Sequence, residues 1–181
     1  MIMYNDFDRV LVSNAEIKER IEQLAARLRE DYAGKVPLFV CILKGSVFFY
    51  ADLLRALRMP VELDFMSISS YGNATRSSGE VRMVKDLDRS IEGKDVIIVE
   101  DIVDSGNTLS YLKQLLLSRG PASVRIVTLL DKPERRVTDV EVEYSCFRIP
   151  DEFVVGYGLD YAEKYRNTDD IYVLKREVFE Q

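Results

Sequence analysis

The chain has 181 residues, which is enough for one domain with a substantial hydrophobic core and is short for two. Its formal net charge of −6 argues against a surface that binds duplex nucleic acid, because such surfaces gain affinity from basic side chains that contact phosphates. The chain contains no histidine, so zinc chemistry is not expected, proton transfer falls to Asp, Glu, Lys or Tyr, and oxygen-bound Mg²⁺ is the expected metal.

Helices and strands are predicted to alternate along the chain. Ser13-Asn14-Ala15-Glu16 forms a capping-box pattern, and apolar residues at helical spacing follow it up to Gly34. The predicted helices are residues 14–32, 46–58 and 107–119, and the predicted strands are residues 38–43, 61–70, 81–84, 96–99, 124–130, 140–147 and 153–156. This order predicts an α/β fold with a parallel sheet between helices, in which ligands bind at the carboxyl ends of the strands.

The most informative segment follows the predicted strand 96–99. Glu100 and Asp101 come directly after the strand, Asp104 follows, and residues 105–108 form a polar loop that leads into a helix. Taken singly, these are solvated acids, a turn residue and a helix cap. Three acids within five residues repel one another unless a cation or hydroxyl donors complete the site. Because backbone N–H groups at a helix N-terminus suit a phosphate, the segment is interpreted as a sugar-phosphate site.

Other segments at strand ends carry two interpretations each. Lys44-Gly45-Ser46 is either a tight turn with a helix cap or a set of backbone amides that face an anion. Lys132, before Pro133, alone reads as a surface lysine, and otherwise as a donor to a ligand carbonyl. Phe153 reads first as part of a core strand, and otherwise as a stacking platform for a flat ring. Residues 69–79 are rich in Ser and Gly and form either an idle surface loop or a lid.

Two further observations concern the environment of the protein. Cys41 and Cys146 lie in apolar segments, which favours buried reduced thiols over a disulfide or a metal pair. Residues 1–13 lack the basic start and apolar stretch of a signal peptide, and no segment is long enough to span a membrane. A cytoplasmic protein with no membrane partner and no nucleic-acid partner is therefore expected.

Taken in their order along the chain, the segments described above resemble those of the purine phosphoribosyltransferases, and specifically those of the bacterial hypoxanthine (hypoxanthine-guanine) branch of that family. Residues 99–108 (VEDIVDSGNT) resemble the family's phosphoribosyl-pyrophosphate signature, and residues 150–161 (PDEFVVGYGLDY) resemble the purine branch. The resemblance implies a type I phosphoribosyltransferase fold in a single domain, residues 1–181. In that fold a central parallel sheet is flanked by helices, with a small hood built from the N- and C-terminal segments.

The activity implied by the resemblance is purine salvage. A Mg²⁺-dependent enzyme of this family transfers phosphoribosyl from 5-phosphoribosyl 1-pyrophosphate to hypoxanthine or guanine, and gives IMP or GMP and pyrophosphate. A homodimer or homotetramer is also implied.

The resemblance further implies a role for each residue at the sugar. Asp104 would accept the proton from N7 of the purine. Glu100 and Asp101 would engage the ribose hydroxyls and Mg²⁺, and Asp160 would lie near the base edge and a second Mg²⁺. The residues implied for the 5-phosphate are Ser105, Gly106, Asn107 and Thr108. Those implied for pyrophosphate are Lys44 and Gly45, presented through a non-proline cis peptide bond, and Arg166.

The base has its own implied contacts. Lys132 would donate a hydrogen bond to the 6-oxo group and so select oxopurines over adenine. Phe153 would stack on the ring, and the backbone of Val154 would meet its edge. Ser70 and Tyr71 would belong to a lid that excludes water.

Three alternatives stay open. A pyrimidine-operon regulator that binds RNA and has uracil phosphoribosyltransferase activity shares the fold, but the acidic balance and the position of Asp104 disfavour it. A signalling receiver domain also combines acids with a Lys132-Pro133 pair, but it needs a strand-end aspartate that this chain lacks between Asp104 and Asp131. A nucleotide-binding module without turnover would bind the ligand and release no pyrophosphate.

Overall fold

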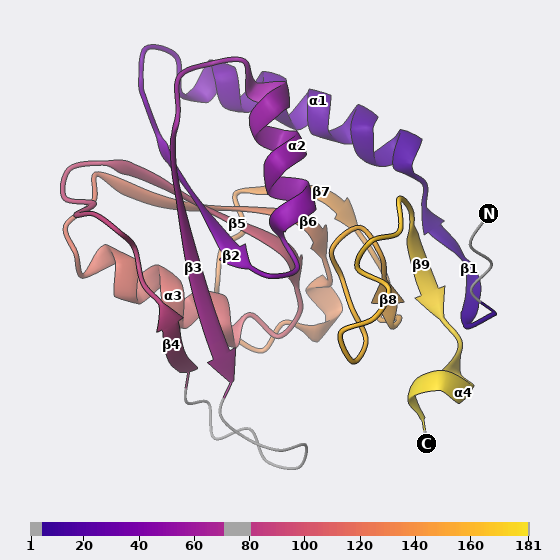
Figure 1. Cartoon of the computed structure of the whole chain (residues 1–181). Coiled ribbons are helices and arrows are strands. Elements are labelled where there is room, and N and C mark those ends of the chain that lie inside the picture. Colours follow the sequence, from indigo (N-terminus) through magenta and orange to yellow (C-terminus); the bar gives the residue numbers. More distant parts are fainter. Residues whose placement is uncertain (1–4, 71–80, 181) are drawn as a thin grey trace.

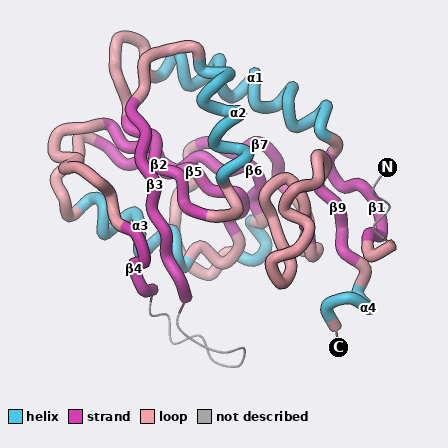
Figure 2. The backbone as a smooth tube through the Cα atoms, in the orientation of Figure 1, coloured by secondary structure: helices cyan, strands magenta, loops and turns pink. Residues whose placement is uncertain are grey.

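Two β-sheets form the framework of the protein (Figures 1 and 2). The computed structural model describes residues 5–70 and 81–180. The strands are β1 Phe7–Val12, β2 Leu38–Leu43, β3 Glu62–Ser70, β4 Val81–Lys85, β5 Asp95–Val103, β6 Ser123–Asp131, β7 Tyr144–Arg148, β8 Val154–Val155 and β9 Ile171–Leu174. The helices are α1 Asn14–Asp31, α2 Val47–Leu57, α3 Asn107–Leu117 and α4 Arg176–Phe179, with a 3-10 turn, η1, at Pro133–Arg135.

The larger sheet has the strand order β4-β3-β2-β5-β6-β7. Strands β3, β2, β5, β6 and β7 run parallel to one another, and β4 runs antiparallel to β3 at the edge. Helices α1 and α2 cover one face of this sheet and α3 covers the other (Figure 1). The predicted α/β class, with a mostly parallel central sheet flanked by helices, is confirmed.

Strand β5 shows why the central strands are continuously apolar. Ile97 and Val99 pack in the core beneath α1 and α2, whereas Val96 and Ile98 pack with Leu112 of α3. Successive side chains of a strand point to opposite faces, so a strand buried on both faces has no polar alternation. The two acids that follow Val99 therefore also point to opposite faces of the sheet.

Helix α1 begins where the capping box predicts. The Ser13 side chain accepts a hydrogen bond from the backbone N–H of Glu16, and the Glu16 carboxylate accepts one from the backbone N–H of Ser13 at 2.8 Å. The Ser13 hydroxyl also donates to the Glu16 carboxylate at 2.6 Å, and this bond, together with the one from the Ser13 N–H, lowers the pKa of Glu16. The helix ends within one residue of the predicted boundary and buries one face, formed by Ile17, Ile21, Leu24, Ala25 and Leu28.

The end of β5 differs from the sequence prediction. The predicted strand stopped at Val99, but β5 continues to Val103, because β6 pairs with it until Val103 lies opposite Asp131. Glu100 and Asp101 are therefore strand residues held by the sheet, and not members of a loop that follows it.

The second sheet has the order β1-β9-β8 and brings the two ends of the chain together (Figure 1). Strand β9 lies between β1 and β8 and is antiparallel to both. This sheet lies beside the carboxyl end of β6, since Ile149 N–H donates to Asp131 C=O and Lys132 Nζ donates to Glu152 C=O.

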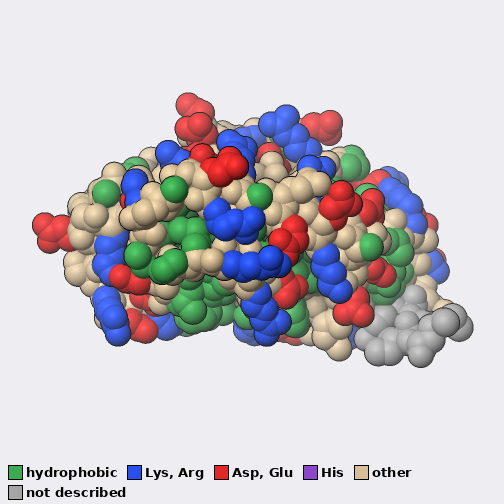
Figure 3. Space-filling model, turned by 90° about the horizontal axis from the view of Figure 1, so that it is seen from above, with side chains coloured by type: hydrophobic (Ala, Val, Ile, Leu, Met, Phe, Trp, Pro, Cys, Tyr) green, Lys and Arg blue, Asp and Glu red, His purple; other side chains and the backbone are tan. Residues whose placement is uncertain are grey.

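The remaining observations on the fold concern helix length, surface charge and the two thiols. In the part of the chain that the structure describes, no helix combines the length and apolarity needed to cross a bilayer. Basic and acidic side chains are interspersed on the face shown in Figure 3. Cys41 and Cys146 are free and buried, and burial raises their pKa values to about 11 and about 12, so both remain thiols at neutral pH.

Candidate active site

The last part of β5 carries two carboxyl groups, one buried and one half-buried. Glu100 is buried on the α3 side of the sheet, and burial, with the nearby charge of Asp101, raises its pKa well above the usual range. Asp101 lies on the other side, where burial raises its pKa to about 6, although it accepts a hydrogen bond from Ile102 N–H at 2.7 Å. Within residues 5–70 and 81–180 neither carboxyl group has a basic partner, so the pair is suited to a cation or to hydroxyl donors.

The segment between β5 and α3 forms a small cavity with Glu100. This cavity has a volume of about 120 Å³, and its polar lining residues are Glu100, Asp104, Ser105, Gly106 and Thr108. Gly106 is the N-cap of α3 with a φ of +83°, and a Cβ there would come within 2.6 Å of Thr138 Oγ1. Only glycine fits this position, so the loop can present its amides and the N-terminus of α3 to an anion. Asn107, also predicted to bind the phosphate, is exposed and does not line the cavity.

Asp104 is held from the side of η1. Its carboxylate Oδ1 lies 2.9 Å from Arg135 Nε, and its backbone oxygen accepts a hydrogen bond from Arg136 Nε at 3.2 Å. Sequence reasoning did not find either arginine. The available signal was the run Glu134-Arg135-Arg136 directly after Pro133.

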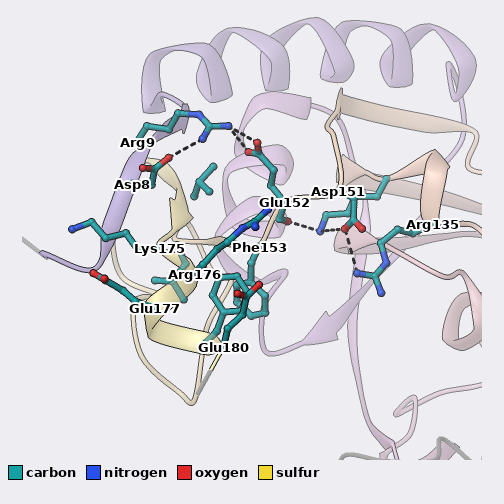
Figure 4. Close-up of a pocket in the computed structure, with 14 residues that line it drawn as sticks. Asp8, Arg9, Arg135, Asp151, Glu152, Phe153, Lys175, Arg176, Glu177 and Glu180 are labelled. Atoms are coloured by element: carbon teal, nitrogen blue, oxygen red, sulfur yellow. Dashed lines mark hydrogen bonds and ion pairs between the residues drawn. The ribbon is translucent and has the colours of Figure 1, made fainter.

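A larger pocket of about 840 Å³ lies between η1 and the second sheet (Figure 4). Lys132 is buried at its edge, and its Nζ donates to Glu152 C=O at 2.6 Å and lies 3.7 Å from Asp151 Oδ1. Phe153 lines the pocket with 38% of its surface exposed, and its ring stacks on Phe179 of α4 at 4.7 Å. The arrangement offers a flat apolar surface beside a cationic donor, which suits a planar ring with a carbonyl.

Three further observations concern residues predicted or missed in this part of the site. Val154, predicted to meet the base edge, is buried and does not line it. Phe179 was missed, because four residues at the end of the chain carry no pattern that relates them to Phe153. Tyr71 and the rest of the predicted lid up to residue 79 lie outside the described residues.

The Lys44-Gly45 turn lies against the acidic end of β5. The peptide bond between Leu43 and Lys44 is cis, as the resemblance implies. A Cβ on Gly45 would come within 1.7 Å of Asp101 Oδ2, and a Cβ on Gly158 would come within 1.9 Å of Gly45 C=O. Only glycines allow these approaches, so the backbone of the turn is in direct contact with the Asp101 carboxylate.

The two predicted pyrophosphate cations are paired with acids of the same loop. Lys44 Nζ lies 3.1 Å from Glu163 Oε2, and Arg166 Nη2 lies 2.8 Å from Asp160 Oδ1 and 3.5 Å from Glu163 Oε1. The charge of Arg166 lowers the pKa of Asp101 and that of Asp160 raises it, so this loop lies close to the acidic end of β5.

The carboxylates do not form a ready-made metal cage. Among the described residues, no group of three or more Asp, Glu, His or Cys side chains is arranged to hold an ion. Asp160 instead pairs with Arg166. Mg²⁺ commonly binds through one or two carboxylates and completes its shell with water and ligand oxygens, so Glu100 and Asp101 fit an ion that arrives with a phosphorylated ligand.

Comparison with known proteins agrees with this geometry. The model of the phosphoribosyl transferase domain family matches residues 11–162. The hypoxanthine-guanine phosphoribosyltransferase of Bacillus subtilis (strain 168) is 51% identical over 179 residues, which cover 99% of each chain. That of Streptococcus thermophilus (strain CNRZ 1066) is 49% identical, over 98% of this chain and 99% of the relative. A crystal structure of a hypoxanthine phosphoribosyltransferase from Staphylococcus aureus matches with a TM-score of 0.95 and 50% identity, over 99% of this chain and 97% of the other.

Proposed function

Because the chain belongs to the phosphoribosyltransferase family, among its hypoxanthine-guanine phosphoribosyltransferases, we propose that it acts in purine salvage. It transfers phosphoribosyl from 5-phosphoribosyl 1-pyrophosphate to hypoxanthine or guanine and releases pyrophosphate. In this reaction the bond from the sugar to pyrophosphate breaks, the bond from the sugar to a ring nitrogen forms, and the N7 proton leaves the base. The observation that carries the proposal is the convergence of two strand-borne acids, a helix N-terminus and a pocket lined by Lys132 and Phe153 on one edge of the sheet.

The sugar phosphate is assigned to the small cavity. The amides of Ser105, Gly106 and Thr108 at the start of α3 bind the 5-phosphate, supported by the positive end of the helix. Glu100 and Asp101 bind the ribose hydroxyls. Mg²⁺, when bound there, neutralises negative charge on the leaving pyrophosphate.

The base is assigned to the neighbouring pocket. Phe153 stacks on the ring, and Lys132 exchanges its bond to Glu152 C=O for one to the 6-oxo group. Contact between the Val154 backbone and the ring edge stays a prediction from the family pattern, because Val154 does not line this pocket. Asp104 accepts the N7 proton, a role that a positioned carboxylate can perform in a chain without histidine.

Pyrophosphate is assigned to the turn opposite Asp101. The amides of Lys44 and Gly45 and the guanidinium of Arg166 bind it, with charge stabilisation that grows as the bond to the sugar breaks. Asn107, Tyr71 and a second Mg²⁺ beside Asp160 stay predictions from the family pattern. So do a cytoplasmic location and a homodimer or homotetramer, the latter to be measured by light scattering.

The activity is tested by incubating the protein with 5-phosphoribosyl 1-pyrophosphate, Mg²⁺ and, separately, hypoxanthine, guanine, adenine or uracil. Formation of nucleotide and release of pyrophosphate are followed together. We expect both products with hypoxanthine and guanine only, and their loss when Mg²⁺ is chelated. Use of uracil alone favours the regulator, and binding without pyrophosphate release favours a module without turnover, so either result contradicts the proposal.

A further inference from the structure

Arg135 connects the two cavities of the site. It lies at the end of η1 and lines the large pocket, and it approaches Asp104, which lines the small cavity. Its Nε lies 2.9 Å from Asp104 Oδ1, and its Nη1 donates to Asp151 Oδ1 at 3.2 Å (Figure 4 shows Arg135 and Asp151 facing each other). Asp151 Oδ1 in turn lies 3.7 Å from Lys132 Nζ.

This bridge joins the two groups that face one edge of the base. In an oxopurine, O6 and N7 are neighbours on the same edge. The proposed function assigns Lys132 to O6 and Asp104 to N7, so their separation must match that edge. Arg135 Nε faces Asp104 Oδ1 as an ion pair without hydrogen-bond geometry, whereas Nη1 donates a hydrogen bond to Asp151. The charge of Arg135, anchored through Asp151, therefore holds the Asp104 carboxylate beside the segment that carries Asp151 and Lys132.

The backbone of Asp104 is fixed by a different residue. Arg136 donates from Nε to Asp104 C=O and pairs with Asp131 through Nη2. The main chain of the acid is therefore held without Arg135, which contacts the carboxylate alone. In a site where a general base is oriented by a third group, loss of that group misplaces the base and leaves binding of the other substrate intact.

We infer that Arg135 is a positioning residue that orients the Asp104 carboxylate toward the N7 proton of the bound base. The inference rests on the proposed function, because it requires Asp104 to be the proton acceptor. The inference predicts that removal of Arg135 lowers kcat only while the carboxylate of Asp104 is present.

The test is a double-mutant cycle of Arg135→Ala and Asp104→Asn, with kcat and both KM values measured for hypoxanthine and 5-phosphoribosyl 1-pyrophosphate. Asp104→Asn is expected to lower kcat by roughly 10²–10⁴-fold, the usual effect of removing a general base. Arg135→Ala is expected to lower kcat by roughly 10²-fold, as for a small misplacement of a reacting group, with KM for the sugar donor unchanged. Adding Arg135→Ala to Asp104→Asn is expected to change kcat by less than about twofold, because coupled residues are not additive.

Conservative and remote variants complete the experiment. Arg135→Lys keeps a charge near Asp104 but lacks the planar fork, so it should recover part of the lost kcat. Glu134→Ala, in the same turn, and Arg55→Ala, an exposed arginine 3.9 Å from Asp52, are the matched controls and should retain wild-type kcat. Thermal unfolding of each variant shows whether it is folded at the assay temperature.

The outcomes separate the two proposals. Absence of nucleotide formation by the wild type, or normal kcat in Asp104→Asn, contradicts the proposed function. If those two results are as expected, a normal kcat in Arg135→Ala overturns the inference alone. So does an equal loss from Arg135→Ala in both backgrounds, since Arg135 then acts independently of Asp104.

Discussion

The acidic end of β5 and the basic loops opposite it balance their charges in opposite ways. Glu100 and Asp101 are withdrawn from water without a basic partner among the described residues, and burial raises the pKa of each. Lys44 and Arg166 lie in loops and are already paired with Glu163 or Asp160. In the described residues, the acids at the end of β5 therefore have no ion-pair partner, whereas the cations of the basic loops already have one.

This difference indicates how each side receives its part of the ligand. Buried carboxyl groups gain most from a cation that restores the lost interactions with water, so Mg²⁺ and the sugar hydroxyls complete the acidic end. An exposed ion pair contributes only about 0–1 kcal/mol, so a phosphate can replace the Glu163 carboxylate at Lys44 with little loss. Ligand binding therefore adds a cation or hydroxyl donors to the acidic end of β5. At the basic loops, it replaces a carboxylate of the protein with a phosphate of the ligand.

The largest effect on activity is expected from Gly45→Ala, which pushes the Lys44-Gly45 turn away from the acidic end of β5. The new Cβ would lie 1.7 Å from Asp101 Oδ2, so the turn or the carboxylate must move. A displacement of about 1 Å at reacting groups lowers the rate roughly 10²-fold, and we expect kcat/KM to fall at least that far. Gly34→Ala is the control for backbone strain alone, because Gly34 has a positive φ, which Gly45 does not have, and nothing lies within 4 Å of its Cβ. It should lose stability and keep kcat/KM, whereas near-normal kcat/KM in Gly45→Ala would show that the contact is dispensable.

The next effect concerns the pH dependence of stability, with Asp101→Asn as the probe. The pKa of Asp101 is about 6 in the folded protein and about 4 in an unfolded chain. Between these values the folded state holds a proton that the unfolded state has lost, so the free energy of unfolding falls as pH rises. Relative to Asp101→Asn, the metal-free wild type should lose roughly 2–3 kcal/mol between pH 4 and pH 6 and recover none of it above pH 6.

Urea denaturation at several pH values, with and without Mg²⁺, measures this difference. Because Mg²⁺ binds ionised carboxylates, it should stabilise the wild type more than Asp101→Asn at pH 7. Asp139→Asn, which removes an exposed carboxyl group, is the control and should follow the wild-type curve. Parallel pH curves for wild type and Asp101→Asn would contradict the withdrawal of Asp101 from water.

Lys132 differs from the cations of the basic loops, because it is buried whereas Lys44 is exposed. Its Nζ donates to the neutral carbonyl of Glu152, so it can turn to a ligand carbonyl without breaking a close ion pair. A hydrogen bond to a charged group contributes about 1.5–3 kcal/mol, and Lys132→Ala should therefore lower kcat/KM for hypoxanthine at least tenfold. Competition between hypoxanthine and adenine measures the selectivity, which should relax. Unchanged selectivity would remove Lys132 from base recognition.

Most of the fold could be predicted from local patterns. The capping box located α1, and the apolar run at residues 38–43 coincides with β2. The extension of β5 to Val103 could not be predicted, because pairing with β6 sustains the strand through two acids that local propensity does not favour. Strands β1 and β9 were also missed, since each is short and depends on a partner from the other end of the chain.

The site was predicted as far as one segment could reveal it. The buried strand, its acids and the glycine loop lie in one continuous stretch, so their chemistry could be inferred from order alone. The pairs Arg135–Asp104 and Lys44–Glu163 join segments far apart in sequence, and no spacing rule predicts them. The charge balance that distinguishes the two sides of the site is therefore a property of the fold.

The smallest effect is expected from Glu163→Gln, which tests the exchange itself. If pyrophosphate replaces the Glu163 carboxylate at Lys44, removal of that charge should favour the bound state. Both side chains of the pair are two-thirds exposed, so its contribution of about 0.2–1 kcal/mol corresponds to pyrophosphate binding about 1.4- to 5-fold tighter. Titration calorimetry with pyrophosphate at two ionic strengths measures this, and the gain should shrink at high salt. Glu22→Gln, which releases Arg58 from an exposed pair on helix α1, is the matched control and should leave the affinity unchanged. Weaker pyrophosphate binding by Glu163→Gln would mean that Glu163 holds Lys44 in place for the ligand. The proposal that pyrophosphate replaces the Glu163 carboxylate at Lys44 would then be wrong.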